Sequence, residues 1–81
     1  MIKIKLKCFS QVKYALSKNE MVIEMKIGST TSDLERIVRQ RSEGELEHID
    51  LSVAVNKKYV KDEVVLNDGD EVALIPPVQG G

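Results

Sequence analysis

Two stretches of alternating apolar and polar residues constrain the fold of this chain more than any other feature. Residues 2–9 read IKIKLKCF, in which apolar side chains alternate with three lysines, and residues 20–27 read EMVIEMKI. Successive side chains of a β-strand point to opposite faces of a sheet, so each stretch predicts a strand with one buried face. The lysines then form the solvent face of the first strand, and Cys8 is a small core residue on its other face.

The hydrophobic period changes from that of a strand to that of a helix after residue 30. An apolar stripe at helical spacing consists of Leu34, Ile37, Val38 and the aliphatic stem of Arg41. Two pairs match the capping pattern S/T-x-x-D/E, namely Thr30 with Asp33 and Ser32 with Glu35. The sequence therefore predicts one main helix over residues 31–41.

The remaining segments are short. Residues 10–19 predict one helical turn or an ordered loop, and strands are expected at residues 51–55 and 71–75. One short strand is expected between them, where Tyr59-Val60 and a short apolar run at residues 64–66 lie. Asn56-Lys57-Lys58 and Asn67-Asp68-Gly69-Asp70 are typical of turns. This order predicts an α+β fold with a mixed sheet of four to five strands and one main helix packed across it. We expect the first and last strands to pair in the middle of the sheet.

Composition excludes several classes of function. The 81 residues make one domain, and 12 basic against 13 acidic residues give no electrostatic drive toward nucleic acid or an anionic membrane. One cysteine and one histidine, His48, make neither a disulfide nor a metal site, and no catalytic triad or phosphate-binding loop is present. No apolar run approaches the ~18 residues of a membrane span and no signal peptide is visible, so a cytoplasmic protein is expected.

The stretch IPPVQGG, residues 75–81, carries the chemistry that the rest of the chain lacks. Pro76 and Pro77 end the last strand and direct the chain outward. We therefore expect a folded domain over residues 1–76 and a flexible tail over residues 77–81. Gly80 and Gly81 have no side chain and can thread a narrow channel. The terminal carboxylate of Gly81 is then the accessible reactive group, once an ATP-using partner has adenylated it. A frayed terminus is the alternative.

The C-terminal third resembles the small subunits of molybdopterin synthase, which are ubiquitin-like sulfur carriers. The matching pieces are Ala54-Val55-Asn56, Leu66, Asp68-Gly69-Asp70-Glu71-Val72-Ala73, Pro76-Pro77-Val78 and Gly80-Gly81. The start of the chain is similar too, with Ile2-Lys3, Phe9 and Gln11-Val12. The resemblance implies a ubiquitin-like β-grasp fold.

The resemblance also implies a function. In that family a ubiquitin-activating-enzyme-like adenylyltransferase uses ATP to adenylate the C-terminal glycine, here Gly81, and a sulfur donor protein supplies the sulfur of a thiocarboxylate. The tail enters the large, catalytic subunit, usually in a heterotetramer, and gives sulfur to cyclic pyranopterin monophosphate, forming the molybdopterin dithiolene. The small subunit has no active site or bound cofactor of its own. Tail insertion would involve Pro76, Pro77, Val78 and Gly80, and the partner interface would map onto Phe9, Tyr59 and Ile75.

Three other functions remain open at this point. A ubiquitin-like modifier joined to lysines of other proteins through Gly81 needs the same tail and the same adenylation. A thiamine-pathway sulfur carrier would share the terminal glycines, although Pro76-Pro77 argues against it. A β-grasp interaction module without a reactive terminus is the last alternative.

Overall fold

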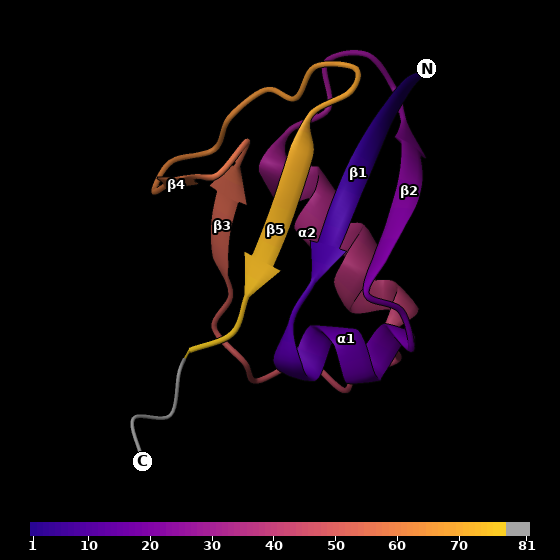
Figure 1. Ribbon diagram of the computed structural model, residues 1–81, viewed down its shortest axis with the longest axis vertical. Coiled ribbons are helices and arrows are strands. Elements are labelled where there is room, and N and C mark those ends of the chain that lie inside the picture. The colour runs from indigo at the N-terminus through magenta and orange to yellow at the C-terminus, as the bar shows by residue number, and fades with distance from the viewer. Residues whose placement is uncertain (78–81) are drawn as a thin grey trace.

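A computed structural model of the chain describes residues 1–77, which form one five-stranded mixed sheet and two helices (Figure 1). The elements in chain order are β1 (Ile2–Cys8), α1 (Ser10–Leu16), β2 (Glu20–Met25), α2 (Thr31–Arg41), β3 (Ser52–Val55), β4 (Lys58–Val60) and β5 (Glu71–Ile75). The strand order is β2-β1-β5-β3-β4. Strands β1 and β5 are parallel neighbours inside the sheet and the other pairs are antiparallel, which confirms the predicted α+β fold.

The core lies between α2 and one face of the sheet. The alternation of β1 is realised as expected, because its apolar side chains Ile2, Ile4, Leu6 and Cys8 are all buried. Leu34 and Val38 of α2 are buried as well, and α1 closes the lower end of the sheet with Val12 (Figure 1). No helix within residues 1–77 covers the second face of the sheet (Figure 1). The lysines of β1 alternate with its buried residues and therefore point to this second face.

Four local expectations need correction. Residues 10–19 contain a seven-residue helix, α1, instead of a single turn or a loop. Ile27 was expected on the buried face of a strand but is 81% exposed, because β2 ends at Met25 before a turn in which Gly28 has a φ of +92°. The short strand is β4, and the apolar run at residues 64–66 makes only one isolated bridge, between Thr30 and Val65. Arg41, in the last turn of α2, is exposed and does not extend the apolar stripe.

The capping box of α2 forms with Thr30 as the N-cap. The Thr30 N–H donates to Asp33 Oδ2 at 2.9 Å, and the Asp33 N–H donates to Thr30 Oγ1 at 3.3 Å. The Thr30 hydroxyl in turn donates to Glu63 Oε2 at 2.7 Å, which ties the helix start to the segment before β5. The backbone bond from Thr30 lowers the pKa of Asp33, and the bond to the Thr30 hydroxyl and the charge of Arg36 act in the same direction.

This cap leads to a prediction about stability. Thr30→Ala should lower the free energy of unfolding by about 1 kcal/mol, because no hydroxyl then accepts from the Asp33 N–H. Urea unfolding of this variant and of wild type at neutral pH measures the difference. The pKa of Asp33 is lower in the folded state than its unfolded value of about 3.9. The ionised carboxylate therefore adds stability that is fully present at pH values above the unfolded pKa and is lost as the pH falls through the folded-state pKa. Urea unfolding of wild type and Asp33→Asn at several pH values measures this. The two stabilities should converge at the acid end, and a gap of constant size would contradict the assignment.

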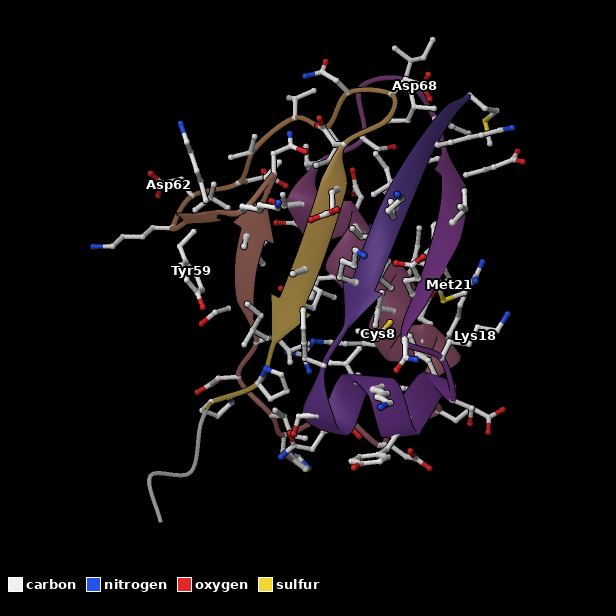
Figure 2. The ribbon with its side chains drawn as sticks, viewed as in Figure 1. Cys8, Lys18, Met21, Tyr59, Asp62 and Asp68 are labelled. Atoms are coloured by element: carbon white, nitrogen blue, oxygen red, sulfur yellow. The ribbon has the colours of Figure 1, made fainter. Side chains whose placement is uncertain are left out.

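The residues of the Asn-Asp-Gly-Asp turn hold the upper end of the sheet together. Asp68 Oδ1 accepts from the Lys3 N–H at 2.7 Å, and the side-chain amide of Asn56 donates to Asp70 Oδ1 at 3.0 Å. Gly69 has a φ of +88°, which favours glycine there. Asp68 lies beside the start of β1 in Figure 2. Much of the motif that carries the family resemblance is therefore structural, and it lies at the opposite end of β5 from the tail.

Candidate functional site

The open face of the sheet is hollowed at its centre because two alanines lie side by side there. Ala73 of β5 pairs with Ala54 of β3, and both point to the face that α2 does not cover. The same row continues to Lys7 on β1 and to Tyr59 on β4. Two small side chains between two long ones leave a depression, and the pairing of four strands fixes its position.

The three residues of the expected partner interface border this depression. Phe9, Tyr59 and Ile75 line one open hollow of about 810 Å³, with Ala54 and Ala73 in its floor. Phe9 is 48% exposed and Tyr59 is 71% exposed, so neither is a core residue. Tyr59 lies on the β3–β4 side of the sheet and Cys8 near the end of β1 (Figure 2). An exposed apolar hollow of this kind is typical of a site that receives a partner's side chain.

Charged side chains surround the apolar part of the hollow. Lys7 Nζ and Glu20 Oε2 are 2.5 Å apart across β1 and β2. This hydrogen bond and the attraction between the two charges raise the pKa of Lys7 and lower the pKa of Glu20, so both groups are ionised at neutral pH. Lys13 and Lys57 also line the hollow, and neither forms an ion pair within residues 1–77. Glu71 adds one carboxylate to the lining, so lysines outnumber glutamates there by three to two. A partner surface with an apolar centre and carboxylates around it would complement this face.

Strand β5 leads from the floor of the hollow directly to the tail. Its last residue, Ile75, borders the hollow and is followed by Pro76, which is buried, and Pro77, which is exposed. Strand β5 ends at Ile75, directly before the two prolines, as the sequence predicts. Pro76 is buried and therefore packs as part of the folded domain. Val78, Gly80 and Gly81 lie outside the described residues, so their predicted roles in tail insertion and sulfur transfer remain predictions.

The other chemically interesting residues are not assembled into a site. Cys8 is buried, and this burial raises the pKa of its thiol and disfavours the nucleophilic thiolate. His48 is exposed in the segment after α2. Among residues 1–77, no group of three His, Cys, Asp or Glu side chains is placed to hold a metal ion. No helix in that range is long and apolar enough to cross a membrane.

Reasoning from sequence missed the two alanines that make the hollow. Ala54 and Ala73 were noted only as part of the family resemblance, because an alanine in a strand has no chemical signature of its own. Their importance arises from the register between β3 and β5, which places them opposite each other. Their pattern among larger strand residues, as in EVALI, is the available signal.

The model of the ThiS family matches residues 6–81 of the chain. The chain belongs to the ThiS family. This match includes the segment that leads from β5 to the terminal glycines, and it confirms the β-grasp fold implied by the sequence resemblance.

Individual relatives of this ThiS-family chain are similar over almost its whole length. The molybdopterin synthase sulfur carrier subunit of Chlamydomonas reinhardtii is 34% identical and aligns with 99% of this chain and all of its own. Among solved structures, molybdopterin converting factor subunit 1 of Pyrococcus furiosus is 30% identical, with a TM-score of 0.85, over 96% of this chain and all of that one. A complex of subunits 1 and 2 of molybdopterin-converting factor from Helicobacter pylori contains a chain that is 26% identical, with a TM-score of 0.69, over 99% of this chain and all of that one.

Proposed function

We propose that this chain is the sulfur-carrier subunit of a molybdopterin synthase and that the carboxylate of Gly81 carries the sulfur. The observation that supports this most is the full-length 34% identity to a sulfur carrier subunit of that enzyme. The apolar hollow beside the last strand adds a docking surface next to the tail. Molybdenum cofactor biosynthesis in the cytoplasm is the corresponding pathway and location.

The proposed chemistry takes place on partner proteins and consists of balanced displacements. A carboxylate oxygen of Gly81 attacks the α-phosphorus of ATP on an adenylyltransferase and releases pyrophosphate. Sulfur at the sulfide level then attacks the acyl carbon and releases AMP, which leaves a thiocarboxylate. On the large subunit, this sulfur attacks a carbon of cyclic pyranopterin monophosphate and displaces the oxygen bonded to that carbon, which leaves as water or on the opened phosphate ester. Water then cleaves the acyl–sulfur bond, and a second loaded chain supplies the second sulfur of the dithiolene. The sulfur stays on the pterin and the carboxylate of Gly81 is regenerated.

The residues of this chain would bind the partner protein and extend the terminal carboxylate into its active site. Phe9, Tyr59 and Ile75 would contact the large subunit around the hollow while residues 77–81 enter its active site, as part of a heterotetramer. The similarity to a chain that is solved as a complex of subunits 1 and 2 supports this partner. Adenylation would use the same terminus on a ubiquitin-activating-enzyme-like protein, with ATP bound there and a sulfur donor protein delivering sulfide-level sulfur.

The loading reaction tests this function directly. The chain is incubated with its adenylyltransferase, ATP and sulfide, and its intact mass should rise by about 16 Da, the difference between sulfur and oxygen. The loaded chain and the large subunit should then convert cyclic pyranopterin monophosphate to molybdopterin. The absence of both results with an adenylyltransferase that loads a control carrier would overturn the proposal.

The same reagents separate the two alternative uses of the terminus. A protein modifier would leave a Gly-Gly remnant on lysines of cellular proteins, which peptide mass spectrometry detects. A thiamine-pathway carrier would transfer its sulfur to a thiazole-forming enzyme and not to the pterin. Pterin conversion without lysine remnants is the result that we expect.

A further inference from the structure

Strand β2 is an edge of the sheet, and its outer side has no partner within residues 1–77. The Cys8 N–H donates to the Asn19 carbonyl oxygen at 2.8 Å, and such bonded pairs recur at every second residue of an antiparallel ladder. The β2 residues that bond to β1 are therefore Met21, Ile23 and Met25. The residues whose backbone N–H and C=O groups point outward are Glu20, Val22 and Glu24.

Apart from two glutamates, this edge lacks the features that usually prevent strand addition. Protected edges are short or carry lysine, proline or a bulge. The opposite edge strand, β4, has three residues and includes Lys58, whereas β2 has six residues and contains neither lysine nor proline. Val22 on β2 is 60% exposed and Ile27 just beyond it is 81% exposed. Figure 2 shows Met21 and Lys18 at this outer side of the molecule.

The glutamates of β2 do not make this edge strongly repulsive, because β1 supplies lysines beside them. Glu20 is paired with Lys7 at 2.5 Å, and Glu24 lies opposite Lys3 in the register of β1 and β2. The acidic charge along the edge is thereby partly compensated within each chain.

We propose that β2 pairs with β2 of a second copy of this chain, antiparallel and about a two-fold axis at Ile23. In this register the outward-facing residues meet as Glu20 with Lys26 and Val22 with Glu24, and on the helix side Met21 meets Met25. An axis at Val22 would place Glu20 opposite Glu24, and an axis at Glu24 would place that residue opposite its own copy. Directly opposed like charges destabilise strand pairs, which disfavours both of these axes. Axes at Met21 or Met25 would pair fewer residues of β2, so charge complementarity and strand length together select the axis at Ile23.

The proposed dimer leaves the floor of the hollow uncovered, and of the charged residues around the hollow it uses Glu20. A two-fold axis perpendicular to the sheet joins two five-stranded sheets into one, with both pairs of helices on the same side. Ala54 and Ala73 are separated from β2 by β1, so the hollow stays open on the joined sheet. The dimer therefore does not depend on the proposed function.

Sedimentation of the full chain between about 10 μM and 1 mM tests the dimer. The weight-average mass should rise from that of one 9.1 kDa chain toward twice that value. Val22→Pro removes an outward N–H that β1 does not use, a position at which an edge strand tolerates proline. This variant should associate at least about tenfold more weakly, while Val22→Thr keeps the N–H and should associate as wild type.

Charge exchange gives a second test that does not depend on proline. Lys26→Glu and Glu20→Lys should each associate about tenfold more weakly alone, because each places like charges opposite one another. An equimolar mixture of these two variants restores both opposite-charge pairs and should recover dimers. A wild-type chain that keeps the mass of one copy at 1 mM, or a mixture that associates no better than its components, would overturn the proposal.

Discussion

A chain that lacks Gly81 should accept sulfur and support pterin conversion at less than about 1% of the wild-type rate, while its thermal midpoint stays unchanged. Each residue spans at most about 3.6 Å, so the shortened terminus would stop that far from the reacting atoms. A displacement of about 1 Å already costs about a hundredfold in rate, and a larger one should reduce conversion below about 1% of wild type. The hydrophobic core is built from residues between Ile2 and Leu74, which explains why stability should not change. Intact mass after loading and the rate of molybdopterin formation are the measurements.

Two variants control for this result. Gln79→Ala alters the tail without changing its length or its glycines and should load and transfer sulfur at close to the wild-type rate. Gly81→Ala keeps the length but adds a methyl group, and it should give an intermediate rate if the channel is narrow. Normal sulfur transfer by the shortened chain would show that Gly81 is not the carrier residue.

Filling the hollow should separate docking from folding. Ala73→Leu adds three carbons to the floor, between Lys7 and the side chains of Tyr59 and Ile75. The added atoms point away from the core, so we expect the free energy of unfolding to change by no more than about 0.5 kcal/mol. Loss of one well-packed contact of about 2 kcal/mol should weaken binding to the large subunit about 30-fold. Calorimetric titration of the large subunit measures this.

The matched control for Ala73→Leu lies on the same face of the sheet. Val22→Leu also adds bulk to the open face, but β2 does not line the hollow at this position, so binding should equal that of wild type. Ala73→Ser keeps the floor small and should also bind normally. Wild-type affinity in Ala73→Leu, with an unchanged thermal midpoint, would place the docking surface elsewhere while leaving the proposed sulfur chemistry intact.

Sequence reasoning succeeded where a local pattern and the tertiary structure agree. In β1 the alternating pattern predicts which side chains are buried, and in α2 the apolar stripe and the capping residues do the same. The bounds of α2 are as predicted. It failed for α1, whose N-cap Phe9 makes no side-chain cap bond and whose first turn has no acidic residue. A helix of seven residues is not stable by itself, and the burial of Val12 against the sheet compensates for these missing signals.

At residues 64–66 the sequence pattern misleads in the opposite way, because a strand-like pattern is present but no strand forms. Their apolar run resembles a strand, but its backbone is used elsewhere, because the Val64 carbonyl accepts from Thr31 and the Leu66 N–H donates to Ser29. Leu66 is buried, so the run serves as a connection that closes the core beside α2. At the candidate site, the family resemblance pointed to three residues that border the hollow and to the tail, whose role remains a prediction. The floor of the hollow depends on a pairing between distant strands, which no local pattern states.

The central position of β5 also decides how the molecule responds to a pulling force. The tail continues β5, which is hydrogen-bonded on one side to β1 and on the other to β3. Force applied to the tail acts along the strand, so the rungs of both ladders share the load and must shear together instead of unzipping one by one. A partner protein that grips the tail can therefore pull on it without peeling open the domain.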